Sequence, residues 1–303
     1  MSLLGQLESE DLKLLLSLQE RRALPAGTTL FRQGDRANSA VFIHDGRLAL
    51  ELYAPGQSRP VEVHHSEAGE LVGEPALIAG GWRSRTAVAT RDTKVGVLHR
   101  ADLKSLLSSF HPASLRIVVA VARHVVGRLQ AHHQPVDQSE ASRLADQAVP
   151  STFDPRPYLP IFPFFRDFTR SDIEALIESG NLYDVERGTV LVHEGQRSSS
   201  CCLVVRGAVG VHQQGQRIGL LGPGCLAGEM APLTGRPTAA ELRMRETGTL
   251  LEVGPAAFSA LTQPGPRVSY KFTNALATTL MGTLARTNLQ RARDALPAAT
   301  GAS

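Results

Sequence analysis

Cysteine, net charge and long apolar runs are all scarce in this sequence. The chain of 303 residues contains three cysteines and no Cys-x-x-Cys spacing, which argues against both a disulfide framework and a cysteine-type metal site. A net charge of +3 gives no general attraction to nucleic acid or to a membrane surface. No run of about 18 apolar residues is present, and Glu8 interrupts the apolar start before it reaches signal-peptide length. These absences predict a cytoplasmic protein with no membrane contact.

What the sequence does contain fits a globular protein of two domains, since 42% of its residues are hydrophobic and the length is large for one domain. Hydrophobic periodicity predicts helices over 9–19 and 111–130 and strands over 28–31, 41–44, 48–52, 61–63, 86–89 and 94–98. The pair Asp45-Gly46 predicts a tight hairpin between two of these strands, because such a turn needs positive φ. Short strands closed by helices at both ends indicate a small β-barrel or jelly roll.

The second half of the chain repeats the first. Counterparts at a constant offset of 161 residues pair Leu7, Asp11, Leu12, Gly27, Gly34 and Gly46 with Phe168, Asp172, Ile173, Gly188, Gly195 and Gly207. The offset then becomes 155 and pairs Gly69, Gly73, Glu74 and Leu98 with Gly224, Gly228, Glu229 and Val253. The change falls where the first copy has the polar loop 53–60. The pattern therefore indicates a duplicated module with one shortened loop.

The predicted fold class is α+β, with two β-roll domains of the double-stranded β-helix or jelly-roll type, each flanked by N- and C-terminal helices. The first domain spans 1–134 and a polar, proline-rich linker spans 135–158, with a weak helix expected over 138–147. The second domain spans 159–296 and a tail spans 297–303. Its closing helix begins near Arg267 and carries an apolar stripe that we expect to offer a contact surface, formed by Phe272, Leu276, Leu280 and Leu284.

The candidate binding segment of the first copy is 73–87, which holds a Gly-Glu pair and an arginine. Gly73 allows a backbone to approach a ligand closely. Glu74 can accept hydrogen bonds from sugar hydroxyls, and Arg83 offers a rigid fork of donors that suits a phosphate. A Gly-Glu pair alone is uninformative, and most arginines are solvated. The position of the segment, which recurs at the same place in both copies, is what indicates a ligand pocket.

The glycines between short strands, and the Gly-Glu-x-Ala-Leu segment that leads to Arg-Ser, resemble the cyclic nucleotide-binding domain. This β-roll is shared by catabolite activators, protein kinase regulatory subunits and cyclic-nucleotide-gated channels. The resemblance covers nearly the whole chain, twice, and 73–87 corresponds to the segment that the family calls its phosphate-binding cassette. The spacing from Glu74 to Arg83 matches the family pattern without a gap.

The resemblance implies a role for each matching residue of the first cassette. Glu74 would accept a hydrogen bond from the ribose hydroxyl, and Arg83 would pair with the cyclic phosphate. Ser84 would assist with its backbone N–H and its hydroxyl. The backbone around Gly73 and Ala76 would approach the sugar-phosphate beside the start of a short helix, whose dipole favours an anion.

Two residues depart from the family pattern. Pro75 stands where the family prefers Leu or Ile; the first turn of a helix tolerates it, but it removes an N–H and an apolar side chain, which would reduce affinity. Trp82 replaces the usual proline, and we expect it to cover core rather than to cap the pocket rim.

The second cassette departs more. It keeps Gly228 and Glu229, but Thr238, followed by Ala239, occupies the arginine position, while Arg236 comes two residues early. We expect this degenerate second site to bind no ordinary cyclic nucleotide.

The sequence thus predicts a non-enzymatic cyclic-nucleotide sensor with no cofactor and no metal. The resemblance implies that ligand in the first roll would draw in the cassette and reposition the helix 111–130, the family's usual switch. We expect this helix to signal to an effector protein or across a homodimer formed through the helices. Seven residues follow the closing helix and the linker is short, so we expect no helix-turn-helix and no direct DNA binding.

Two alternatives remain open on the sequence alone. One is a ligand-free interaction scaffold built from two β-rolls. The other is a bicupin-like metalloenzyme, although His64-His65 and His132-His133 lack cupin ligand spacing. The ligand itself is left between cAMP, the commoner family ligand, and cGMP or a cyclic dinucleotide. Arg123, His124 and Val125 are candidates to face the base.

Overall fold

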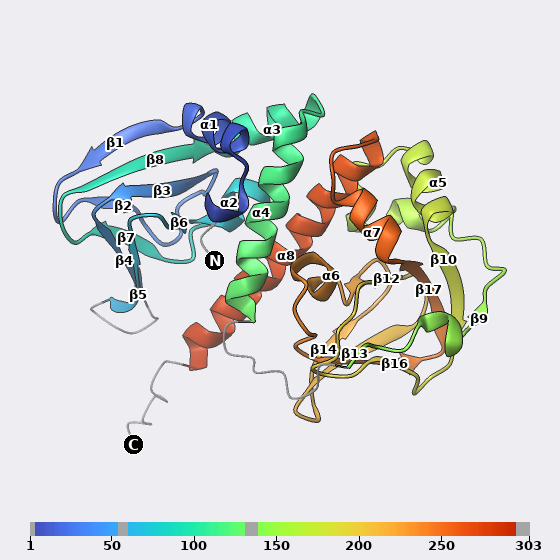
Figure 1. The fold of residues 1–303 in the computed structure, drawn as a ribbon. Coiled ribbons are helices and arrows are strands. Elements are labelled where there is room, and N and C mark those ends of the chain that lie inside the picture. The colour runs from blue at the N-terminus through green and yellow to red at the C-terminus, as the bar shows by residue number, and fades with distance from the viewer. Residues whose placement is uncertain (1–3, 54–59, 131–138, 295–303) are drawn as a thin grey trace, which may run out of the picture. The chain divides into compact units, whose positions relative to one another are not determined.

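The computed structural model describes residues 4–53, 60–130 and 139–294 (Figure 1). The chain divides into two compact units: Met1–Val125 with Ala277–Ser303, and Val126–Leu276. The histidines His132 and His133 and the predicted tail 297–303 lie outside the described residues. No helix of the described ranges is long and apolar enough to cross a bilayer.

The first β-roll consists of two antiparallel four-stranded sheets, in the orders β1-β8-β3-β6 and β2-β7-β4-β5. Its elements in chain order are η1 (Leu4–Gln6), α1 (Ser9–Ser17), β1 (Glu20–Leu24), β2 (Thr29–Phe31), β3 (Ser39–Asp45), β4 (Arg47–Leu52), β5 (Val61–Glu67), β6 (Leu71–Val72), α2 (Glu74–Ile78), β7 (Thr86–Ala89), β8 (Thr93–His99), α3 (Arg100–Ser108) and α4 (Pro112–Leu129).

The second β-roll repeats both sheets, in the orders β15-β12-β17-β10-β9 and β11-β16-β13-β14. Its elements are η2 (Leu144–Asp146), β9 (Val149–Pro150), η3 (Leu159–Ile161), η4 (Pro163–Phe165), α5 (Arg170–Ser179), β10 (Asn181–Val185), β11 (Val190–Val192), β12 (Cys201–Val204), β13 (Ala208–Gln213), β14 (Gln216–Leu221), β15 (Leu226–Ala227), α6 (Met230–Thr234), β16 (Glu241–Glu246), β17 (Gly248–Val253), α7 (Pro255–Leu261) and α8 (Arg267–Asp294).

The strand registers of the two rolls agree residue by residue. Phe31 pairs with Ala87 in the first roll. In the second roll Val192, at the offset of 161 from Phe31, pairs with Leu242, at the offset of 155 from Ala87. An ion pair between the first and last helix is repeated as well. Arg116 of α4 binds Asp11 of α1 at 2.6 Å, and at the same two offsets Lys271 binds Asp172. The predicted fold class of two helix-flanked β-rolls is confirmed.

The hairpin predicted at Asp45-Gly46 is wrong. β3 pairs with β6 and β8, whereas β4 pairs with β5 and β7, so the two strands belong to different sheets. Gly46 has φ +99°, and a Cβ there would lie 2.4 Å from the Thr93 Oγ1 atom. The glycine is required because the chain turns a tight corner from one sheet to the other, a feature of packed sheets.

Other differences concern short or irregular elements. The strands β1 and β6 and the helix α3 were not predicted. The weak helix expected over 138–147 is wrong for its described part, where the one helical feature is the single 3₁₀ turn η2. The closing helix is confirmed as α8, and its stripe from Phe272 to Leu284 is fully buried within the chain. It is therefore not a free contact surface.

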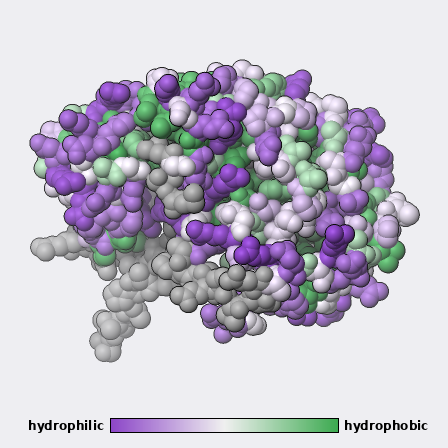
Figure 2. Space-filling model, in the orientation of Figure 1, coloured by the Kyte–Doolittle hydropathy of each residue, from purple (hydrophilic) through white to green (hydrophobic). Residues whose placement is uncertain are grey.

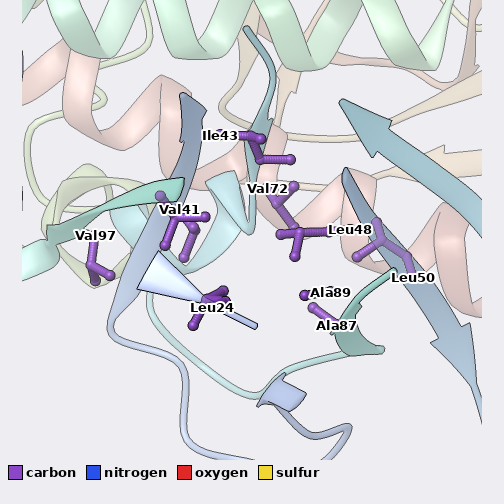
Figure 3. Close-up of a cluster of buried hydrophobic side chains, with 10 residues drawn as sticks. Leu24, Val41, Ile43, Leu48, Leu50, Val72, Ala87, Ala89 and Val97 are labelled. Carbon is purple, nitrogen blue, oxygen red and sulfur yellow. The ribbon is translucent and has the colours of Figure 1, made fainter. Parts of the chain in front are cut away.

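The core of the first roll lies between its two sheets. Figure 3 shows Leu24, Val41, Ile43, Val72 and Leu48, among others, directed toward one another from facing strands. On the face drawn in Figure 2, hydrophilic and hydrophobic residues are intermixed. Inside the roll, the cassette supplies Ala87 to the same cluster, which places the candidate site against the core.

Candidate functional site

The cassette of the first roll is positioned by a glycine at a sharp turn. Gly73 follows β6 and precedes α2, with φ +85°, a left-handed conformation that favours glycine. Pro75 lies in the first turn of α2, where a missing N–H is tolerated. Glu74 and Ala76 on the same helix are buried.

Arg83 enters the roll and is 8% exposed. Two backbone hydrogen bonds fix its main chain. Its N–H donates to the Asp35 carbonyl and its C=O accepts from the Gly34 N–H, each at 2.9 Å. The guanidinium carbon lies 4.0 Å from the centre of the Phe31 ring, and Nη2 donates to the Ser39 hydroxyl at 2.9 Å. Phe31 and Ser39 thus fix the guanidinium, and we call these two residues the arginine platform.

One nitrogen of this guanidinium is left without a partner. Arg83 Nη1 is buried and has no hydrogen-bond acceptor among the described residues. Burial lowers the pKa of Arg83, and the nearby Asp35 carboxylate offsets only part of that effect. An unsatisfied buried donor costs about 1–3 kcal/mol, and more when it is charged. An anion that entered the pocket would remove this penalty.

The same nitrogen lies against the cassette backbone. A Cβ built at Gly73 would be 2.4 Å from Arg83 Nη1. The structure therefore brings the predicted residues Gly73 and Arg83 together across the cassette, with Glu74 next in the chain. Ser84 is exposed and Trp82 is 68% exposed. The expectation that Trp82 covers core is therefore wrong; its ring instead lies 5.3 Å from the Arg36 guanidinium carbon.

Glu74 connects the cassette to α4. Its side chain is 2% exposed, and Oε1 lies 3.4 Å from Nε2 of His124 on α4. A histidine that carries the proton at this nitrogen gives the carboxylate a charge-assisted contact. His124 therefore has a role that was not predicted, since the sequence suggested only that it would face a base.

Three further site residues were missed in the sequence. Phe31, Ser39 and Asp35 meet Arg83 because β2 pairs with β7 and because the loop after β2 lies beside the cassette. Ser39 does carry a signal, because Ser200 repeats it at the offset of 161. Nothing in the sequence marks Phe31 as an arginine platform.

The second cassette has the same backbone around a different side chain. Thr238 donates its N–H to the Gln196 carbonyl and accepts from the Gly195 N–H, each at 2.9 Å, which reproduces the two backbone bonds of Arg83. Its hydroxyl donates to the His193 carbonyl at 2.8 Å. Arg236 is exposed. The alignment of Thr238 with the arginine position is therefore supported by backbone geometry.

Apolar side chains take the place of the guanidinium in the second roll. Leu242, at the position of Ala87, puts its Cδ1 atom 3.5 Å from where a Cβ of Gly228 would be. Val192 stands where the first roll has Phe31. Glu229 is 8% exposed, and burial raises its pKa to about 7, whereas Ala239 lies partly buried at the strand entry. No lysine or arginine of the described part of the second roll is buried.

Neither pocket resembles a metal centre. Among residues 4–53, 60–130 and 139–294, no three His, Cys, Asp or Glu side chains are grouped as metal ligands. Cys201 and Cys202 are buried, and burial raises the pKa of the Cys202 thiol to about 12, which keeps it protonated and unreactive.

Comparison with known proteins gives one family for both rolls. The family profile described as the cyclic nucleotide-binding domain matches residues 21–110 and 183–264, together more than half of the chain. The cyclic AMP receptor protein of Thermus thermophilus is 32% identical over 120 residues, which are 39% of this chain and 55% of that protein. A lysophospholipase of Candida albicans is 28% identical over 185 residues, 58% of this chain and 13% of that protein. The chain thus spans about half or less of these relatives.

Solved structures of low similarity were also found. The regulatory domain of Toxoplasma gondii PKA with cAMP matches 96% of this chain and 92% of its own, at 15% identity and a TM-score of 0.33. The Thermus thermophilus catabolite activator protein matches 46% of this chain and 75% of its own, at 25% identity and a TM-score of 0.35.

Proposed function

Because the chain belongs to the cyclic nucleotide-binding domain family, we propose that it is a sensor that binds a cyclic nucleotide in its first β-roll. The observation that carries the proposal is Arg83, a buried guanidinium on a built platform with one nitrogen unpartnered among the described residues. The ligand site comprises Gly73, Glu74, Pro75, Ala76, Arg83 and Ser84. cAMP is the first candidate, supported by the name of the Thermus relative, and cGMP is the second.

The contacts around the cassette suggest how binding would be relayed. The cyclic phosphate would pair with Arg83 Nη1, while Glu74 would accept the ribose hydroxyl. Glu74 also contacts His124 on α4, and Arg116 ties α4 to α1. A ligand that engages Glu74 would therefore change a contact of α4 directly. We propose that α4 passes this change to a protein partner or to a second subunit.

Calorimetric titration of the full chain with cAMP, cGMP and cyclic dinucleotides tests the proposal. We expect one mononucleotide to bind with a dissociation constant below about 100 µM and with one site per chain. If none binds in that range, the sensor function is refuted. The ligand-free scaffold of two β-rolls would then be the better account.

Replacing Gly73 with alanine is expected to weaken nucleotide binding at least about tenfold. The added methyl group would sit 2.4 Å from Arg83 Nη1 and push the guanidinium from its position. Gly69→Ala is the matched control, because Gly69 has a similar φ of +91° but nothing within 4 Å of an added Cβ. Equal losses in the two variants would show that backbone strain, not the arginine, explains the effect.

A further inference from the structure

The stretch 139–150 lies along the second roll and is bonded to it at both ends. At one end, the Arg197 N–H donates to the Ser139 carbonyl and the Ala141 N–H donates to the Arg197 carbonyl, each at 2.8 Å. At the other end β9 pairs with the outer edge of β10. We call residues 139–150 the strap. It joins the β9–β10 edge of one sheet to the loop between β11 and β12.

Between these ends the strap places one apolar side chain inside the roll. Leu144 is 6% exposed and belongs to the buried cluster of the second roll. Every other buried member of this cluster occupies the position of a residue packed in the cluster of the first roll, at the offsets of 161 and 155. Leu144 alone has no counterpart. Ala141 and Ala148 of the strap pack against the same cluster.

The strap lies beside the cassette, not at a remote part of the core. Its partner Arg197 corresponds to Arg36, which in the first roll bridges to Trp82 of the cassette. In the second roll the bridge of Arg197 goes to Glu140. The cluster that receives Leu144 includes Val192 and Leu242. In the first roll these positions are held by Phe31 of the arginine platform and by Ala87. The strap therefore lies beside the part of the second roll that corresponds to the proposed nucleotide site of the first roll.

We propose that the strap is an intramolecular ligand of the second roll, with Leu144 as its anchor. The first roll keeps a charged guanidinium for an anion, and the second has replaced that guanidinium by Leu242 and a satisfied Thr238 hydroxyl, which suit an apolar peptide side chain. Residues 131–138 join the strap to Gln130, directly after α4.

Amide hydrogen exchange of the full chain, compared between wild type and Leu144→Ala, tests this assignment. Loss of the anchor is expected to raise exchange in 139–151 on the order of 30-fold, while β12 and β17 keep their protection. Val149→Ala is the matched control, because Val149 is on the same strap but 69% exposed, and it is expected to change nothing. Unchanged exchange in 139–151, or an equal rise throughout the second roll, would overturn the proposal; the second result would make Leu144 ordinary core.

A second measurement separates a displaceable ligand from a fixed structural element. In the full chain carrying Leu144→Asp, the strap is expected to leave the roll, because burial of a carboxylate there has no partner. A synthetic peptide of residues 139–151 is expected to bind this variant in trans and to slow exchange in β11 and β15. The same peptide with Leu144→Asp is the control. Failure of the unaltered peptide to bind, or unfolding of β12 and β17 in the variant, would refute the role as a ligand.

Discussion

Arg83→Ala is expected to weaken cyclic nucleotide binding by about 30-fold to several thousand-fold, or about 2–5 kcal/mol, because it removes one partner of a buried charge pair. The nucleotide phosphate would lose the charged donor that Arg83 Nη1 offers it. Titration calorimetry with the tightest ligand of the wild-type chain measures the loss. Arg83→Lys is expected to recover little, since an ammonium can neither stack on Phe31 nor reach Ser39 and the phosphate together.

Two controls isolate the effect of this arginine. Thr238→Ala alters the corresponding position of the second roll and is expected to leave the affinity unchanged. Arg170→Ala removes a cation whose side chain is 90% exposed, and it is expected to do the same. Equal losses for Arg83→Ala and Thr238→Ala would show that the site has been assigned to the wrong residues.

The stability of the ligand-free variant completes this test. Arg83 makes one side-chain hydrogen bond and leaves Nη1 unpartnered among the described residues. Arg83→Met would keep the apolar stem and remove the buried charge. Its free energy of unfolding is therefore expected to equal or exceed that of wild type, so lost binding in this variant cannot be attributed to lost folding.

The backbone of the site follows from the sequence because the chain carries two copies of it. Gly73, Glu74 and Arg83 are in one short segment. The second copy retains the glycine and the glutamate, as Gly228 and Glu229, but not the arginine. The platform could not be predicted in this way. Phe31 and Ser39 reach Arg83 only through the pairing of β2 with β7 and through the path of the loop before β3, and these are tertiary contacts over about fifty positions of sequence.

Two wrong predictions have a common physical origin. Asp45-Gly46 has the composition of a hairpin turn, and 138–147 has that of a weak helix. Local composition specifies which backbone angles a segment tolerates, but tertiary packing chooses among them. Gly46 uses its positive φ to change sheets. The strap forms only the 3₁₀ turn η2 in place of a longer helix, because its ends bond to the roll and Leu144 is buried there. Thr93, which lies against Gly46, and Arg197 and β10, which bond the strap, are all distant in sequence from the segments they contact.

The stability of the second roll is expected to depend on pH through Glu229. Burial raises the pKa of this carboxyl from 4.5 to about 7, so the folded chain holds a proton that the unfolded chain releases between these values. The folded state then binds more protons, and the free energy of unfolding falls as the pH rises from about 4.5 to about 7. The loss is about 3 kcal/mol and is complete above that window.

Urea unfolding followed by far-ultraviolet circular dichroism at pH 5 and pH 8 measures this change. Glu229→Gln keeps the shape of the side chain but cannot ionise. The part of the difference in unfolding free energy between pH 5 and pH 8 that Glu229 causes should therefore disappear in this variant. The variant should also be more stable than wild type at pH 8. Glu178→Gln, at an exposed position of α5, is the control that should retain the wild-type difference.

If Glu229→Gln shows the same pH dependence as wild type, Glu229 is ionised in the folded chain and a cation or a ligand must accompany it there. The second cassette would then still be a charged site. The expected result would instead make it neutral below about pH 7, in keeping with the proposal that it holds an apolar strap in place of a phosphate.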